Sequence, residues 1–220
     1  MKAPKTGQSK TLPLAAHDGG GRFPGLRTED LSGHWDPSTS SVVMQRLGRQ
    51  PHMRFLTPAE EAAADALFNQ LLGQREEPRI PIVQMVDARL AEAETDGWHY
   101  EGMPDDGRAW RVSLAWLDDD ARLRCGGPIA RASWDEQHRV LQSIQNLGKD
   151  RWHDWPASHV WSLWTRYACT AFYSHPWAWD EIGFTGPAYP RGYKNLGLNA
   201  LEPTEVADSR PRQDPLRRRT

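Results

Sequence analysis

Cysteine is scarce in this sequence. Among 220 residues only Cys125 and Cys169 occur, and they form no CxxC or CxxCH arrangement. Structural zinc sites and covalently attached haem need closely spaced cysteines, so neither is expected here. We expect both thiols to be buried and free, with a bridge to each other or to a partner chain as the alternative.

Long apolar runs and an excess of one charge are also missing. No apolar stretch approaches the roughly 20 residues that a membrane-spanning helix needs. The start, MKAPKTGQSKTLPLAAHDGGG, has only LPLAA as an apolar piece, which predicts neither a signal peptide nor a twin-arginine leader. The formal net charge is -2, so no general basic field attracts nucleic acid or anionic lipid. We expect a cytoplasmic protein that binds no nucleic acid and does not insert directly into a membrane.

The sequence motifs of common catalytic and cofactor sites are absent. There is no HExxH or GxSxG motif, and the glycines at 19–21 follow no predicted strand, so no FAD or NAD site is expected in this chain. His153 and His159 are the closest histidine pair, and a proline-containing turn separates them, which favours hydrogen-bonded imidazoles over metal ligands. The neighbouring carboxylates of Asp180 and Glu181 should point apart on a loop, which favours a charged loop tip or a salt bridge over a hydrolytic pair.

Helical signals dominate the middle of the chain. Thr57 and Glu60 have the spacing of a capping box, and Gly73 is placed to end the helix that follows. Ser133 and Glu136 repeat the capping box further along. Apolar residues spaced three and four apart predict further helices within residues 36–48, 80–94, 108–121 and 156–175.

These signals predict an all-α fold, with strands few. We expect an irregular antiparallel bundle of five to six helices, followed by a long ordered C-terminal loop rich in aromatic residues, proline and glycine. The expected organisation is a flexible N-terminal arm over 1–33, a single helical domain over 34–207 and a flexible basic tail over 208–220.

Tryptophan is abundant, and it gathers in the second half of the chain. Seven of the 11 tryptophans fall between Trp134 and Trp179. The segment Tyr173–Tyr193, YSHPWAWDEIGFTGPAYPRGY, contains six aromatic residues, three prolines and three glycines. Rigid aromatic rings lose little entropy on binding and are enriched at the energetic centres of protein interfaces.

We therefore interpret this segment as a surface for another polypeptide. Arg191 would donate hydrogen bonds to a partner carbonyl or carboxylate, and His175 would fix the start of the segment by hydrogen bonding. Two alternatives stay open: the rings stack on sugars in a carbohydrate-binding helical module, or they fill the core of this protein itself. The predicted partner-binding residues are His175, Trp177, Trp179, Phe184, Pro187, Tyr189, Arg191 and Tyr193.

The same residues resemble a known family. SLWTRYACTAFYSHPWAWDEIGFTGPAYPRGY, together with FLTPAEEAAADALFNQLL and IPIVQMVDARL upstream, is similar to the gluconate 2-dehydrogenase subunit 3 family, over roughly residues 55–208. The resemblance is most specific in the segment Tyr173–Tyr193.

The resemblance implies a helical small subunit that accompanies a flavoprotein dehydrogenase of the glucose-methanol-choline (GMC) type. The partner would carry FAD, oxidise a sugar or sugar acid at an alcohol carbon, and pass electrons to an acceptor or a cytochrome c subunit. The small subunit would hold no catalytic residue and would aid folding, stability or export of its partner. Many members of the family carry a twin-arginine leader, and this sequence departs from that pattern, which favours a cytoplasmic complex.

Overall fold

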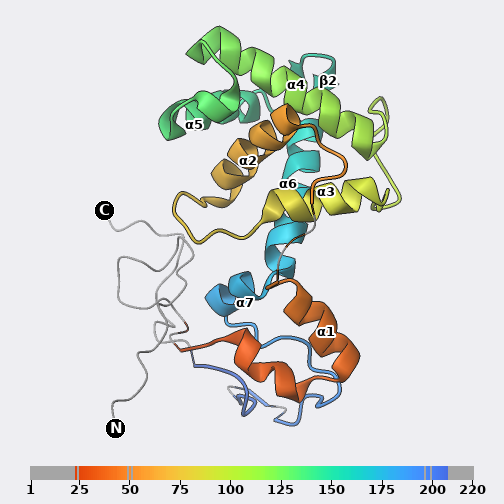
Figure 1. Cartoon of the computed structure of the whole chain (residues 1–220), viewed down its shortest axis with the longest axis vertical. Helices are drawn as coiled ribbons and strands as arrows, with labels where there is room; N and C mark the ends of the chain where they lie inside the picture. Colours follow the sequence, from red (N-terminus) through yellow and green to blue (C-terminus); the bar gives the residue numbers. More distant parts are fainter. Residues whose placement is uncertain are drawn as a thin grey trace. The chain divides into compact units, whose positions relative to one another are not determined.

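The structure confirms an all-α fold. It is a computed structural model that describes residues 23, 25–48, 50, 52–195, 197, 198 and 200–207. Within this part the elements are η1 (Thr28–His34), α1 (Pro37–Gln45), α2 (Pro58–Leu72), α3 (Ile82–Ala91), α4 (Asp106–Cys125), η2 (Ile129–Arg131), α5 (Trp134–Gln145), β1 (Arg151–Trp152), β2 (Trp155–Pro156), α6 (Ala157–Ser174) and α7 (Pro176–Ile182) (Figure 1). The described residues thus hold seven α-helices, where five to six helices were expected.

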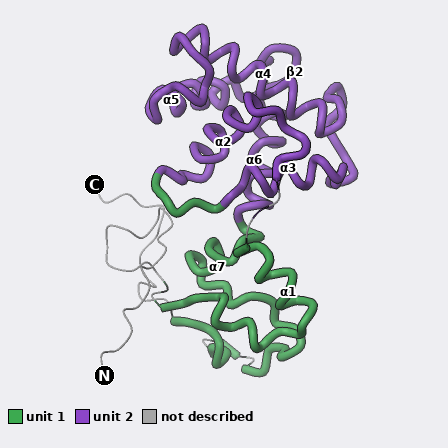
Figure 2. Tube along the Cα trace, viewed as in Figure 1, with its two compact units in different colours: residues 1–49, 76–80, 173–220 green, residues 50–75, 81–172 purple. Residues whose placement is uncertain are grey.

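The chain divides into two compact units (Figure 2). Unit 1 takes its described residues from 1–49, 76–80 and 173–220, and unit 2 consists of those in 50–75 and 81–172. The single domain predicted over 34–207 stays a prediction, since two compact units can fold together or apart.

The two chain ends were predicted to be flexible. Residues 1–22 and 24 of the predicted arm, and all of the predicted tail over 208–220, lie outside the described residues. The described remainder of the arm contains most of η1, and Thr28 in that helix is completely buried.

Unit 2 is built around α2, which contacts α3, α4 and α5. Both predicted capping boxes are present: Thr57 with Glu60 begins α2, and Ser133 with Glu136 begins α5. Gly73 ends α2 with φ 66°, a left-handed conformation that costs glycine little.

The longest helix, α4, extends beyond its predicted range of 108–121. Asp105 caps its start because its side chain accepts a hydrogen bond from the backbone N–H of Arg108. Its end is set by Gly126, which has φ 78°. The helix is therefore longer than the range predicted from apolar periodicity, because the capping residues that set its two ends lie outside that range.

The core of unit 2 is aromatic, and two of its rings donate hydrogen bonds from α6 to α4, whereas Trp110 Nε1 is buried without a hydrogen-bond partner among the described residues. Trp164 Nε1 donates to Ser113 Oγ over 3.0 Å, and the Tyr167 hydroxyl donates to Asp106 Oδ2 over 2.7 Å. Burial is the main reason that the pKa of Tyr167 is raised well above its usual range. The largest fully buried side chains include Trp110, Trp164, Tyr167 and Phe68.

One buried carboxylate fixes the approach to α2. Asp87 of α3, 1% exposed, accepts hydrogen bonds from the backbone N–H groups of three successive residues, at 2.7, 2.9 and 2.7 Å. These donors belong to Arg54, Phe55 and Leu56. A single side chain therefore joins α3 to the segment that leads into α2.

The strands and the cysteines are minor features of unit 2. β1 and β2 form a short antiparallel pair, in line with the expectation of few strands. Cys125 and Cys169 are free, as expected, but the expectation that both are buried is wrong: Cys125 is half-buried and Cys169 is exposed. Cys169 is outside the buried face of α6, where Ala168 and Phe172 lie.

Unit 1 is small, and two tryptophans supply much of its core. Trp35, Val43 and Trp179 form a buried cluster, with Leu31 packed against it. Asp36 caps α1 by accepting hydrogen bonds from two backbone N–H groups of its first turn. The C-terminal segment was predicted as a loop from Pro176 onward; instead, its first seven residues form α7.

Candidate functional site

The start of α7 is fixed by a histidine cap. His175, 2% exposed, accepts a hydrogen bond through Nδ1 from the backbone N–H of Trp177, at 3.2 Å. The two rings meet edge to face with centroids 5.1 Å apart, and Pro176 stands in the first turn of the helix. The hydrogen bond expected from His175 at the start of the segment is therefore present.

The middle of α7 is tied to η1 by a half-buried carboxylate, that of Asp180. Asp180 Oδ1 accepts hydrogen bonds from the backbone N–H and the Oγ1 hydroxyl of Thr28, at 2.7 and 2.6 Å. Burial raises the pKa of Asp180, against the lowering effect of these two hydrogen bonds. Asp180 thus has a structural partner 152 residues away in sequence, which fits a structural role better than a hydrolytic one.

Two glycines let the segment after α7 lie close to other parts of unit 1. Gly183 has φ 75° and ends α7, and a Cβ atom there would lie 2.6 Å from the ring of Phe23. Gly186 has φ 81°, and a Cβ atom there would lie 2.3 Å from Trp35. Both positions require glycine, because of the left-handed backbone and because a neighbouring ring fills the space of a side chain.

The eight predicted partner-binding residues lie together along α7 and the segment that follows it, but they differ in exposure. His175 and Trp179 are buried within unit 1, so they contribute to its own core. Trp177, Pro187 and Arg191 are half-buried. The exposed members are Phe184, Tyr189 and Tyr193, with exposed fractions of 40%, 69% and 62%.

Arg191 already uses part of its donor set within the chain. Its Nη2 donates to Thr185 Oγ1 over 3.2 Å, while Nε and Nη1 are buried without a hydrogen-bond partner among the described residues. Buried, unpaired guanidinium N–H groups are costly. Arg191 is therefore the residue of this segment with the most to gain from an added acceptor.

One exposed residue and one buried residue of this region were not among the predicted site residues. Ile182, at the end of α7, is 47% exposed, and Thr28 holds Asp180 from a region expected to be a flexible arm. The Thr28 contact joins distant parts of the sequence and has no local signal. Ile182 could have been found from its position on a short helix between Pro176 and Gly183.

The two closest histidines have ring partners in unit 2. His153 Nε2 lies 3.1 Å from Asp120 Oδ1 and the ring stacks on Trp116, in line with the hydrogen-bonded role preferred for it. His159 stacks on Tyr100 with centroids 3.9 Å apart, but its buried Nδ1 has no hydrogen-bond partner among the described residues, so the hydrogen bond expected of it is not found there. Among the described residues, no group of three or more His, Cys, Asp or Glu side chains is arranged to hold a metal ion.

No helix in the described part of the chain is both long enough and apolar enough to cross a bilayer.

The fold and the exposed rings define a class of protein: a helical protein with exposed aromatic residues after its last helix. Comparison with known families then gives the assignment. The family model of gluconate 2-dehydrogenase subunit 3 matches residues 58–186, more than half of the chain, and the chain belongs to this family. No curated protein and no solved structure matched the chain. The family is named as one subunit of a gluconate dehydrogenase, which implies a partner polypeptide.

The matched region begins with the first residue of α2 and ends at Gly186. It therefore includes α7 and Phe184, whereas Tyr189, Arg191 and Tyr193 follow it.

Proposed function

We propose that this chain is a non-catalytic accessory subunit that binds and stabilises an FAD-dependent GMC-type sugar or sugar-acid dehydrogenase. The observation that carries the proposal is the exposure of Phe184, Tyr189 and Tyr193 on a segment whose backbone is held in place at Asp180 and Gly186. Fixed aromatic side chains that lie in water bury much area on docking at little entropic cost.

The proposed role is stabilisation by mass action. A subunit that binds only the folded form of its partner raises the free energy of unfolding of that partner. The increase grows with the logarithm of the ratio between the concentration of the subunit and Kd. FAD and the catalytic residues would belong to the partner, and a cytochrome c subunit is a further candidate member of the complex. We place the complex in the cytoplasm.

Purification from the source cell through a tag on this chain tests the proposal. We expect a second, larger polypeptide in the eluate and the absorption bands of flavin. A colourless eluate with sugar oxidation by the isolated chain would contradict it. A change in the tryptophan fluorescence of the isolated chain on adding sugars would instead favour the carbohydrate-binding alternative.

Substitution of the exposed rings tests whether the partner binds to this segment. Tyr189→Ala combined with Tyr193→Ala should lower the yield of the flavoprotein at least about tenfold, since central aromatic contacts often contribute about 2 kcal/mol each. The matched control is Leu123→Ala, because Leu123 is 86% exposed on α4 in unit 2. Equal flavin yields from both variants would exclude the two tyrosines from the interface.

A further inference from the structure

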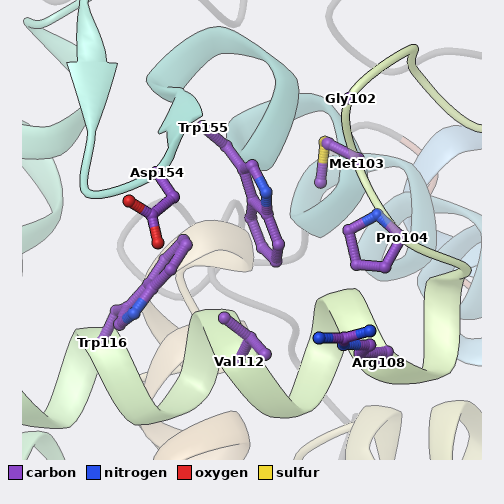
Figure 3. Close-up of a pocket in the computed structure, with 8 residues that line it drawn as sticks. All are labelled: Gly102, Met103, Pro104, Arg108, Val112, Trp116, Asp154 and Trp155. Atoms are coloured by element: carbon purple, nitrogen blue, oxygen red, sulfur yellow. The ribbon is translucent and has the colours of Figure 1, made fainter.

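A groove in unit 2 follows one side of α4 (Figure 3). Its volume is about 570 Å³. Arg108, Val112 and Trp116 are spaced four apart and therefore lie along one side of the helix. From the first to the last of them the helix rises about 12 Å. The other residues lining the groove are Gly102, Met103, Pro104, Asp154 and Trp155.

The aromatic part of the groove is held by ring contacts. The Trp116 ring stacks on His153 with centroids 4.9 Å apart, and it meets the Trp155 ring at 4.5 Å. Asp120 Oδ2 accepts a hydrogen bond from Nε1 of Trp152 over 2.9 Å, which fixes the hairpin that carries Trp155. These contacts position the rings that line the groove before anything binds, and a preformed surface loses little entropy on binding.

The two ends of the groove carry opposite charges. Figure 3 shows Arg108 at one end and Asp154 at the other, with Val112 and Trp155 between them. Both residues are exposed. The hydrogen bonds of these two residues use their backbones: Arg108 N donates to Asp105, and the Asp154 carbonyl accepts from Arg151. Within the described part of the chain, neither charged side chain has an ion-pair or hydrogen-bond partner.

We propose that this groove binds an extended segment of another polypeptide, in which an apolar side chain lies between an acidic and a basic residue. The carboxylate of the segment would pair with Arg108, its cation would pair with Asp154, and the apolar side chain would cover Val112 and Trp116. Four extended residues span about 13 Å, which matches the length of this face of α4. A neutral sugar would bring no charge to either end. The groove is lined by residues of unit 2, whereas Phe184, Tyr189 and Tyr193 belong to unit 1, so this proposal stands or falls independently of the flavoprotein partner.

Binding is tested with the blocked peptide GEALAKG and the full chain labelled with ¹⁵N. We expect the indole N–H signals of Trp116 and Trp155 to shift as the peptide is added. The indole of Trp110 is the internal control, because it is fully buried in the same unit and does not line the groove. Absence of any shift at Trp116 and Trp155 would overturn the proposal.

Reversing the charge of Arg108 or of Asp154 tests which charged residue of the peptide lies at each end of the groove. Arg108→Glu should weaken binding of GEALAKG about threefold to tenfold and make GKALAKG the preferred peptide. Asp154→Lys should have the matching effect and make GEALAEG preferred. Arg124→Glu, an exposed position on the same helix outside the groove, is the control and should leave the order of the peptides unchanged.

Two results would overturn the proposal even if a peptide binds. The first is an unchanged order of peptide affinities in both charge-reversed variants. The second is that glucose or gluconate shifts the same two indole signals and displaces GEALAKG, which would make the groove a sugar site.

Discussion

The half-buried carboxylate of Asp180 in α7 makes the stability of unit 1 depend on pH. Burial raises the pKa of Asp180, while its hydrogen bonds from Thr28 lower it by a smaller amount. A carboxyl group whose pKa is higher in the folded than in the unfolded chain binds protons more readily when folded. Its effect on stability therefore becomes less favourable as the pH rises from the ordinary aspartate range through the raised pKa.

Asp180→Asn isolates this effect, because asparagine keeps an oxygen that can accept from Thr28 but carries no charge. We expect the free energy of unfolding of the native protein, relative to this variant, to decline from acid to neutral pH. Urea unfolding at a series of pH values measures it. If the difference in free energy of unfolding rises over that range instead, the hydrogen bonds from Thr28 lower the pKa of Asp180 by more than burial raises it.

Asp180→Ala provides the comparison within the same site. It removes the acceptor and leaves the backbone N–H of Thr28 unpaired at a completely buried position. An unsatisfied buried donor costs about 1–3 kcal/mol, so this variant should be less stable than Asp180→Asn by about that amount at neutral pH.

At the scale of elements, Asp87 connects α3 to the start of α2. Its substitution by asparagine replaces one of two acceptor oxygens by an NH₂ group that faces backbone N–H donors. We expect Asp87→Asn to lower the free energy of unfolding by at least about 2 kcal/mol, since hydrogen bonds to charged groups contribute about 1.5–3 kcal/mol.

The control for this variant is Asp135→Asn, at an exposed position in the first turn of α5. A surface substitution of this kind changes the free energy of unfolding by about 0.5 kcal/mol or less. If both variants unfold at the same urea concentration, the three backbone hydrogen bonds to Asp87 contribute little to stability.

The helices that could be predicted are those with local signals. The capping boxes at Thr57 and Ser133 involve residues three apart in sequence, so the beginnings of α2 and α5 followed directly. α7 was missed because the frequent prolines and glycines after Pro176 were read as a loop. Pro176 and Gly183 are in fact the boundary residues of a short helix, one in its first turn and the other just past its end.

The candidate site could be placed on the right segment, but its exposed and buried rings could not be separated. Trp179 and Tyr189 both follow a proline within a few residues and look equivalent in composition. Their difference depends on tertiary contacts of distant residues: Trp35 packs in the same cluster as Trp179, while Tyr189 is 69% exposed. Likewise, the pairing of Thr28 with Asp180 joins residues 152 apart and has no signature within a local window.

At the scale of the whole molecule, stability measurements can separate the buried rings of the segment Tyr173–Tyr193 from its exposed rings. Trp179 is 6% exposed and belongs to the core of unit 1, so Trp179→Ala should cost the isolated chain about 3–5 kcal/mol. Tyr189 and Tyr193 lie mostly in water, so their replacement by alanine should change the stability of the isolated chain by about 0.5 kcal/mol or less for each.

The same two tyrosine substitutions should behave differently once the proposed partner is present. Binding raises the Tm of a folded protein with increasing partner concentration, and the increase depends on Kd. We therefore expect the double variant Tyr189→Ala with Tyr193→Ala to match the native chain in urea unfolding alone, but to gain less in Tm as partner is added. A double variant that is strongly destabilised alone would place both rings in the core of the free chain, and the interface would then have to involve other residues.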